Sequence, residues 1–233
     1  MIEAIGIVVP AHDEEELLPS CLAALGEAAD VAQARCPGIR VRLVVTADAC
    51  ADDTPVLAGL GGATVVRIAA RNVGRARAAG VRAILRRYRP ETLWLATTDA
   101  DSVVPPQWLA RQLGYAEQGW DAVAGTVTVA DWTGHTPATA REFIRSYGDW
   151  SDWHPHVHGA NLGFSAGAYL AAGGFPPLRT GEDHALITAL QGLGRRVRRA
   201  PDLQVVTSAR RGYRAPAGFG HKLTTLGDAT LAR

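Results

Sequence analysis

The first half of the chain alternates short apolar runs with longer segments of helical spacing. β-Branched and apolar residues dominate the runs at 4–10, 41–47, 63–69 and 92–98. Each run leads into a segment in which apolar residues recur at helical spacing, at 14–29, 52–60, 73–88 and 105–119. Buried strands that alternate with helices of this length are typical of a parallel sheet covered on both faces. The pattern therefore predicts an α/β fold.

The second half of the chain is less regular. A further strand is predicted at 121–129, and a stretch rich in Trp, His, Gly and Asp follows it up to His158. A helix is predicted at 182–194, ahead of an arginine-rich tail. No internal repeat and no low-complexity linker divides the sequence. We therefore expect one Rossmann-like domain over 1–233 with a mostly parallel central sheet, in which 1–101 form the nucleotide-binding half and 102–233 a less regular half.

The composition narrows the class of protein. Hydrophobic residues make up 47% of the chain and the formal net charge is +1, so no global charge attracts nucleic acid. Three cysteines without C-x-x-C spacing disfavour a disulfide framework or a structural zinc site, and favour a reducing compartment. The N-terminus has no cationic leader, and no apolar run approaches the ~20 residues that span a bilayer. We expect a cytoplasmic protein without a transmembrane segment, with peripheral contact to a membrane left open.

Most of the polar residues that directly follow the predicted strands are acidic. Ligands of open α/β sheets bind beyond the carboxyl ends of the strands, so these residues are candidates for a site. They are His12, Asp13, Glu14, Asp48, Asp52, Asp53, Arg71, Asn72, Asp99 and Asp101. A cluster of carboxylates is costly unless a cation neutralises it, and hard oxygen ligands suit Mg²⁺ or Mn²⁺. The alternative for the triplet from Asp99 to Asp101 is a solvated turn in which Asp caps the next helix.

Six blocks of the sequence follow one another in a distinctive order. They are IGIVVPAHDEEELL, LVVTADACADDT, RNVGRARAAGVRAIL, LATTDADSVVPPQWL, GANLGFSAGAYLAAGGF and GEDHALITAL. In these blocks, over about residues 2–215, the chain resembles family 2 glycosyltransferases of the GT-A fold. The resemblance implies a GT-A fold and an enzyme of the hexosyltransferase type whose second half binds the acceptor. It also implies a nucleotide-diphosphate sugar as donor and Mn²⁺ or Mg²⁺ as cofactor.

The same resemblance assigns residues to the donor. Those implied to hold the nucleobase and ribose are Pro10, Ala11, Glu14, Asp48 and Arg71. The D-x-D motif of the family falls on Asp99, which faces the ribose and the metal, and on Asp101, which ligates the metal on the diphosphate. A divalent cation and a diphosphate would explain why two like charges stand together there.

Transfer of a sugar from a nucleotide diphosphate also needs a base for the proton of the acceptor hydroxyl, a task for a carboxylate. Glu182 and Asp183 stand at a predicted helix start. Resemblance to the E-D pair of the family assigns Asp183 as the base of an inverting, in-line attack, and Glu182 to acceptor positioning. The alternative is helix capping, because carboxylates in a first turn interact favourably with the helix dipole.

The segment HPHVHG places three histidines, His154, His156 and His158, at period two on one face of an extended chain. This pattern is compatible with a metal site, with an acceptor-pocket role for His158, or with ordinary polar loop residues. Trp153 and the neighbouring tryptophan at 150 either stack on a sugar ring or apolar acceptor, or are buried in a core. By resemblance, the acceptor side comprises His158, Asn161 and Trp153.

The tail departs from the family pattern. Many GT-A enzymes have a metal-binding histidine near the end of a late strand, where this chain has Thr207 and Ser208 with His221 as a distant substitute. Arg210 and Arg211 are candidates for clamping the diphosphate, because guanidinium groups match phosphate oxygens. The arginine run at 195–199 is either a solvated surface or a contact for an anionic acceptor or membrane.

These observations predict a metal-assisted, inverting glycosyltransferase. The expected donor is a UDP-sugar and the expected acceptor a hydroxyl of an unidentified small or lipid-linked molecule. A noncatalytic nucleotide-sugar-binding module is one alternative, disfavoured because both acidic motifs are present. A sugar-phosphate nucleotidyltransferase is another, disfavoured because the loop after the first strand is acidic where that class has a glycine-rich, basic loop.

Overall fold

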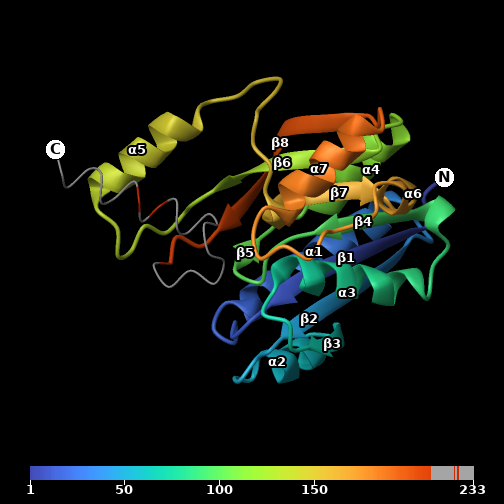
Figure 1. Ribbon diagram of the computed structural model, residues 1–233, viewed down its shortest axis with the longest axis horizontal. Coiled ribbons are helices and arrows are strands. Elements are labelled where there is room, and N and C mark those ends of the chain that lie inside the picture. The colour runs from blue at the N-terminus through green and yellow to red at the C-terminus, as the bar shows by residue number, and fades with distance from the viewer. Residues whose placement is uncertain (211–222, 224, 226–233) are drawn as a thin grey trace.

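The computed structural model describes residues 1–210, 223 and 225, and within them a single mixed sheet organises the chain (Figure 1). The strand order is β3-β2-β1-β4-β7-β6-β8-β5. The strands are β1 Ala4–Ala11, β2 Arg40–Asp48, β3 Thr64–Ile68, β4 Leu93–Thr97, β5 Ser102–Val103, β6 Ala122–Thr128, β7 Leu162–Ser165 and β8 Val197–Thr207.

Most neighbouring strands of the sheet are parallel. β1 pairs in parallel with β2 and β4, β2 with β3, and β6 with β8. β7 runs antiparallel between β4 and β6, and the short β5 runs antiparallel beside β8. The predicted α/β fold with a mostly parallel sheet is therefore confirmed. Its order also explains how the sheet continues into the second half of the chain, because β7 links β4 to β6.

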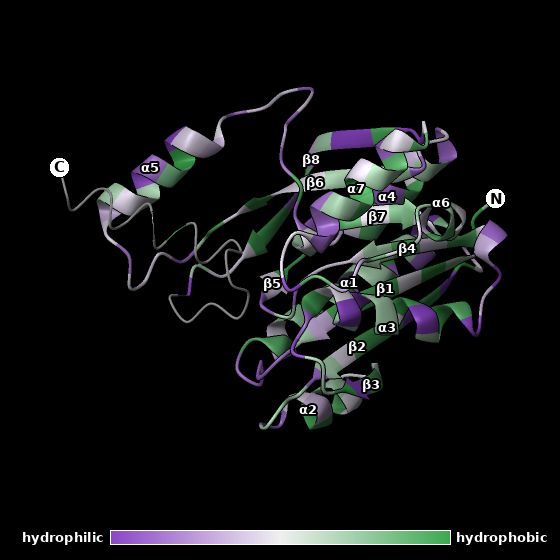
Figure 2. Ribbon diagram, viewed as in Figure 1, coloured by the Kyte–Doolittle hydropathy of each residue, from purple (hydrophilic) through white to green (hydrophobic). Residues whose placement is uncertain are grey.

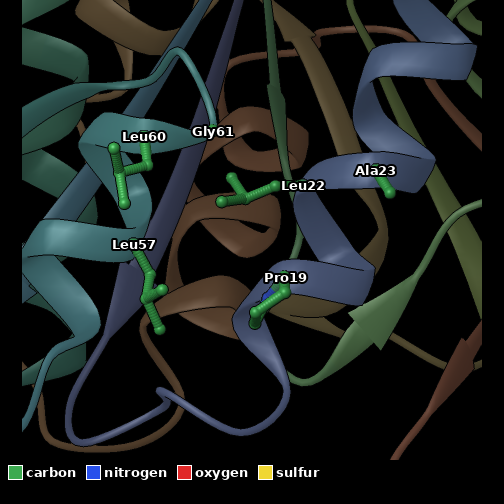
Figure 3. A pocket seen from close by; sticks show the side chains of 6 residues that line it. All are labelled: Pro19, Leu22, Ala23, Leu57, Leu60 and Gly61. Carbon is green, nitrogen blue, oxygen red and sulfur yellow. The ribbon is translucent and has the colours of Figure 1, made fainter.

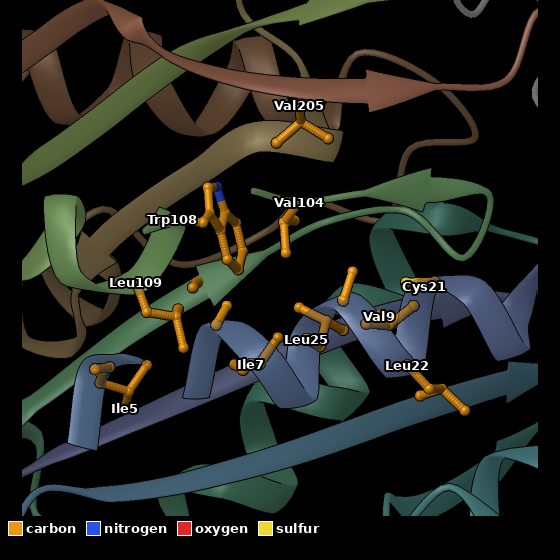
Figure 4. Packing of buried hydrophobic residues seen from close by; sticks show 14 of the residues in the cluster. Ile5, Ile7, Val9, Cys21, Leu22, Leu25, Val104, Trp108, Leu109 and Val205 are labelled. Atoms are coloured by element: carbon orange, nitrogen blue, oxygen red, sulfur yellow. The ribbon is translucent and has the colours of Figure 1, made fainter. Parts of the chain in front are cut away.

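Helices cover both faces of the sheet, as the alternating pattern predicts. The α-helices of the described residues are α1 Leu18–Arg35, α2 Thr54–Leu60, α3 Val73–Leu85, α4 Trp108–Glu117, α5 Pro137–Tyr147, α6 Ala166–Ala171 and α7 Glu182–Gly192, of which all but α5 pack on the two faces of the sheet. Buried side chains of α1, α2 and α4 pack with one face of β1 in the cluster that Figure 4 shows. Those of α3, α6 and α7 pack on the opposite face. No helix in this described part of the chain is long and apolar enough to cross a membrane.

Helix α3 lies unusually close to the sheet, and a glycine permits this approach. A Cβ atom at Gly80 would lie 2.5 Å from Cγ1 of Val8 in β1 and 2.9 Å from Oγ1 of Thr46 in β2. Because contacts this short do not occur between real side chains, only glycine fits at this position. The close approach brings the side chains of α3 to the carboxyl ends of the central strands.

Helices α5 and α6 of the second half were not predicted from the sequence, and α5 is the longer of the two. Helix α5 lies apart from the other helices in Figure 1, and Figure 2 shows its mixed hydropathy. Its buried residues Thr139, Phe143 and Tyr147 belong to or border a third, smaller core cluster. They recur at every fourth position, which is helical spacing, but the positions between them are polar except for one alanine and one isoleucine.

The arginine run at 195–199 is partly built into the fold. Arg198 and Arg199 lie in β8, and the guanidinium of Arg199 donates to the carbonyl of His156 at 2.8 Å. Arg196 lies over the ring of Trp120, 4.5 Å from its centroid. Arg195 and Arg196 are exposed, as expected of a solvated surface, whereas Arg198 and Arg199 are partly buried. Contact of this run with an anionic acceptor or a membrane stays a prediction.

Candidate active site

The two carboxylates of the D-x-D triplet lie just beyond the carboxyl end of β4. Asp101 is 16% exposed in its side chain and Asp99 is 36% exposed. Burial and the charge of Asp99 together raise the pKa of Asp101 to about 7, against the opposing charge of Arg210. Burial is the larger cause, and the like charge of Asp99 adds to it.

A buried arginine on α3 joins this triplet to the second acidic motif. The side chain of Arg77 is 3% exposed, and its Nη2 donates to Oδ1 of Asp99 at 2.6 Å. Its Nε donates to Oε1 of Glu182 at 2.9 Å. The fold therefore brings together two acidic motifs that lie more than eighty residues apart in the sequence, as the sequence predicts.

The carboxylates of the second motif stand at the start of α7 but have different surroundings. Glu182 is 5% exposed and ion-paired with Arg77, and burial raises its pKa while the charge of Arg77 opposes the rise. Asp183 accepts hydrogen bonds from the backbone N–H groups of Gly159 at 2.7 Å and His184 at 2.8 Å. The bond to His184 is a contact within the first turn of the helix, whereas the bond to Gly159 ties Asp183 to a separate segment.

A second arginine neutralises part of the acidic cluster. Arg210, beyond the end of β8, forms a two-pronged ion pair with Glu14, and its Nη2 lies 3.3 Å from Oδ2 of Asp101. Glu14 therefore faces Arg210, and its backbone N–H donates to Oγ1 of Thr54 at 2.7 Å. Arg211, the other predicted diphosphate clamp, and His221 lie outside the described residues.

The residues present fit a divalent cation. Glu14, Asp99, Asp101, Glu182 and Asp183 supply more negative charge than the two arginines paired with them neutralise. Asp99 and Asp101 offer hard oxygen atoms, and Mg²⁺-type ions are commonly held by one or two carboxylates together with substrate phosphates. At the end of β8, the hydroxyl of Thr207 accepts a hydrogen bond from Ser102 at 3.0 Å, so the late strand brings a hydroxyl close to the D-x-D triplet.

The predicted nucleobase loops also lie at this edge of the sheet. Oδ1 of Asp48 accepts from the backbone N–H groups of Ala70 and Arg71, at 2.6 and 2.8 Å, and Oδ2 accepts from Asn72 at 2.8 Å. Asp48 therefore shapes the loop after β3, in which Arg71 has a left-handed φ of 46° and an exposed side chain. Pro10 and Ala11 form the end of β1, directly beside the end of β2.

One trio of possible metal ligands lies in the same loops. Atoms of His12, Asp13 and Cys50 come within 4.8 Å of one another, and no other such trio occurs in the described part of the chain. Nδ1 of His12 bonds to the carbonyl of Asp48 at 2.7 Å, which fixes the ring. In the part of the chain that the structure describes, the three histidines of the HPHVHG segment form no such group, so the metal site has no support among the three interpretations of this segment.

Those three histidines instead form a stacked column. Neighbouring ring centroids are 5.9 Å apart between His154 and His156, and 5.8 Å apart between His156 and His158. Nε2 of His154 bonds to the carbonyl of Ala124 at 3.0 Å, and Nε2 of His158 bonds to the hydroxyl of Tyr147 at 2.9 Å. The period-two spacing therefore placed the three rings on one face, as predicted, and Nε2 of each ring bonds to a protein atom.

The remaining predicted acceptor residues differ sharply in exposure. Trp153 is 58% exposed and lies edge-on to Trp150, with ring centroids 6.2 Å apart. Asn161 is completely buried, and its amide donates to the carbonyls of Thr126 and Leu203, both at 2.8 Å. Direct contact of Asn161 with an acceptor does not fit this placement, because its side chain is enclosed by the protein.

Two surface hollows lie away from these acidic residues. One, of about 370 Å³, lies between α1 and α2, where Figure 3 shows Leu22 opposite Leu57 and Leu60. The other, of about 670 Å³, borders β5, β8 and the start of α1. Neither is lined by a carboxylate of the two motifs, so the candidate site rests on the convergence of charged groups at the sheet edge.

The sequence itself matches a known family. The profile described as glycosyl transferase family 2 matches residues 6–169, which is more than half of the chain. This chain belongs to glycosyl transferase family 2. The matched residues include Asp99 and Asp101 and end before Glu182 and Asp183. No curated protein matches the chain.

Solved structures of similar fold include glycosyltransferases. S. aureus TarS 1–349 in complex with UDP-GlcNAc is 12% identical, with a TM-score of 0.65 over 100% of this family 2 chain and 67% of TarS 1–349. The mannosyltransferase PcManGT from Pyrobaculum calidifontis, in complex with GDP-Man and Mn²⁺, is 21% identical, with a TM-score of 0.65 over 90% of this chain and 58% of that one.

A third similar structure is glucosyl-3-phosphoglycerate synthase from Mycobacterium tuberculosis in complex with Mn²⁺, UDP and glucosyl-3-phosphoglycerate. It is 17% identical, with a TM-score of 0.55 over 99% of this chain and 78% of that chain. In another TarS 1–349 structure this chain spans 61% of the length. At these identities the likeness establishes the GT-A type of fold, and confirms that part of the expectation.

Two residues of the candidate site were missed from the sequence. Arg77 occupies the buried face of α3, at helical spacing from the buried Gly80, Val81 and Ile84. A charged residue in the apolar stripe of a helix is a signal of a buried ionic partner. Gly159, which holds Asp183, gave no comparable signal, because its role depends on the meeting of two distant segments.

Proposed function

We propose that this chain is a metal-assisted, inverting glycosyltransferase that moves a sugar from a nucleotide-diphosphate sugar to an acceptor hydroxyl. The observation that carries the proposal is the guanidinium of Arg77, which lies 2.6 Å from Asp99 and 2.9 Å from Glu182. One side chain thus joins the carboxylates suited to the donor and the pair suited to base catalysis. A UDP-sugar is the first donor to test, and the acceptor is a small or lipid-linked molecule.

The proton transfer is assigned to Asp183. Its carboxylate is anchored by the N–H of Gly159 at 2.7 Å, which leaves further lone pairs for an acceptor hydroxyl. As the oxygen of the acceptor attacks the anomeric carbon from the face opposite the diphosphate, Asp183 takes the hydroxyl proton. Attack from that face inverts the configuration of the sugar. Glu182, buried and paired with Arg77, holds the start of α7 beside it.

The donor side is assigned to Asp99, Asp101 and Arg210. A divalent ion held by the two aspartates would stabilise the negative charge of the departing nucleoside diphosphate. Arg210, which lies beside both Asp101 and Glu14, supplies a guanidinium that matches phosphate oxygens. The exposed ring of Trp153 offers an apolar face on the acceptor side.

Structures of similar fold support the choice of donors. TarS was solved with UDP-GlcNAc, and PcManGT with GDP-Man and Mn²⁺. We therefore propose titrating UDP and GDP into the purified protein by calorimetry, each with and without Mn²⁺. Micromolar binding of one nucleotide that requires Mn²⁺ is expected, and the corresponding nucleotide sugars are then assayed for nucleotide release.

Two substitutions separate the proposed roles. Asp101→Ala should abolish the Mn²⁺-dependent binding, because it removes a metal ligand, whereas Asp183→Asn should keep the nucleotide Kd within about threefold and abolish turnover. Asp30→Asn, in an exposed position of α1, is the matched control. Equal loss of nucleotide binding in Asp101→Ala and Asp183→Asn would contradict the division of roles. Binding without turnover of any sugar nucleotide would favour a noncatalytic nucleotide-sugar-binding module.

A further inference from the structure

Arg77 has an unusually complete set of partners for a side chain in the interior. Besides Asp99 and Glu182, its Nη1 donates to Oγ1 of Thr97 at 2.5 Å and to the carbonyl of Thr98 at 3.5 Å. The planar guanidinium offers five N–H donors in a fixed fork, and four of them are used by these bonds. The side chain is therefore held in one orientation.

The contacts of Arg77 extend to the segment that anchors the proposed base. A Cβ atom at Gly159 would lie 2.2 Å from Nη2 and 2.7 Å from Cζ of Arg77, so the backbone of Gly159 packs directly on the guanidinium. The N–H of Gly159 donates to Oδ2 of Asp183. Arg77 thus contacts the end of β4, the start of α7 and the short helix Gly159–Asn161 that lies between them.

The charge of Arg77 is also secured by its partners. Burial alone lowers the pKa of an arginine, but the charges of Asp99 and Glu182 outweigh burial and raise the pKa of Arg77. The group therefore stays cationic between two carboxylates. Removing one partner of such a buried pair leaves an uncompensated charge, which is strongly unfavourable.

We propose that Arg77 is a positioning residue that couples the two acidic motifs of the site. It orients the Asp99 carboxylate toward the donor and, through Glu182 and Gly159, holds Asp183 at a fixed place relative to the sugar. The inference deepens the proposed transferase function and rests on it. Because reacting groups must be aligned within a fraction of an ångström, Arg77 contributes to kcat more than to nucleotide affinity.

The test compares Arg77→Lys with Arg82→Lys, an exposed arginine on the same helix. Lysine keeps the charge but cannot reach both carboxylates and Thr97 in one plane. For Arg77→Lys we expect kcat of nucleotide release to fall by about 100-fold while the Kd of UDP or GDP with Mn²⁺ changes by less than about threefold. Arg82→Lys should match the unmodified chain in both quantities.

A second variant covers the case in which Arg77→Lys does not fold. Thr97→Val removes one hydrogen-bond acceptor of Arg77 and leaves both ion pairs in place. We expect it to lower kcat by about tenfold, again with little change in nucleotide affinity, because the guanidinium of Arg77 loses one of the hydrogen bonds that fix its orientation. A double-mutant cycle with Glu182→Gln adds a further check, since residues that act through one another give non-additive effects on kcat.

The outcomes separate failure of this inference from failure of the proposed function. Folded Arg77→Lys or Thr97→Val with kcat within about twofold of the unmodified chain overturns the positioning role. A parallel fall of kcat and nucleotide affinity in Arg77→Lys also overturns it, because Arg77 would then serve binding. If the unmodified chain itself neither binds a nucleotide nor releases one from any sugar nucleotide, the proposed function fails and the coupling of the motifs with it.

Discussion

Replacing Asn161 with leucine tests whether this residue binds an acceptor or holds the fold together. The side-chain amide donates to the carbonyls of Thr126 and Leu203, and Oδ1 accepts from Nε1 of Trp108 at 2.9 Å. Asn161 thereby connects β6, β8 and α4 around the short helix that precedes β7. Leucine has nearly the same size and offers none of these bonds.

The expected loss of stability follows from three partners that become unsatisfied. A buried donor or acceptor without a partner costs about 1–3 kcal/mol. Asn161 is 0% exposed, so water cannot replace it, and the apolar side chain of leucine recovers only part of the loss. We expect the free energy of unfolding to fall by about 3–5 kcal/mol, which is a large share of the ~5–15 kcal/mol typical of a domain.

Urea unfolding monitored by tryptophan fluorescence measures this loss, and at this chain length Tm should fall by about 6–20 °C. Gln33→Leu is the control, because its amide makes one long surface bond, 3.5 Å to the carbonyl of Ile39. It should change stability by less than about 0.5 kcal/mol. Asn161→Leu with unchanged stability but lost transfer would refute this reasoning and restore Asn161 to the acceptor site.

Two further substitutions probe the packing and the pH dependence of the fold. Gly80→Ala should destabilise the protein by about 1–3 kcal/mol, because the added Cβ meets Val8. The control Gly26→Ala, on the open side of α1, should stabilise it by up to about 1 kcal/mol. If thermal unfolding shows that both substitutions shift stability in the same direction, the close approach of α3 to the sheet is contradicted. Burial, and then the neighbouring His156, lower the pKa of His154 to about 4, below its ordinary value near 6.5. Its contribution to stability is therefore complete above pH ~6.5 and lost as the pH falls toward 4, by up to about 3 kcal/mol. His154→Gln should flatten this part of the pH-stability curve and the exposed His184→Gln should not, as urea titrations at several pH values would show.

The first half of the fold follows closely from the sequence because its strands are buried on both faces. The predicted strand at 4–10 corresponds to β1, Ala4–Ala11, and the predicted helical segment at 73–88 contains α3, Val73–Leu85. The pattern of apolar residues that predicts such segments lies within the segments themselves. By contrast, β7 spans only Leu162–Ser165, and β5 only Ser102–Val103, so neither is long enough to show a period.

Of the candidate site, the carboxylates were predictable from the sequence, but their pairing with arginines was not. Asp99 and Asp101 follow a buried strand, and the carboxyl ends of parallel strands are where α/β proteins bind ligands. The arginines that balance them come from elsewhere, Arg77 from a helix face and Arg210 from beyond the end of β8. Pairings of this kind depend on tertiary contacts between distant segments, which no local pattern encodes. Asn161 illustrates the converse, because a matching motif placed it near the acceptor without revealing its burial.

The balance of charge at the site bears on how a donor would bind there. Arg77 is enclosed, and its fork is committed to Asp99, Glu182 and the end of β4, so it cannot turn toward a ligand without breaking buried bonds. Arg210 is 26% exposed and pairs with Glu14 and Asp101 at the rim. Of these two arginines, only Arg210 can therefore exchange a carboxylate for a phosphate at modest cost, and a divalent cation arriving with the diphosphate would take its place beside Asp101. On the proposed function, Arg77 is the fixed part of the site and Arg210 the part that responds to the donor.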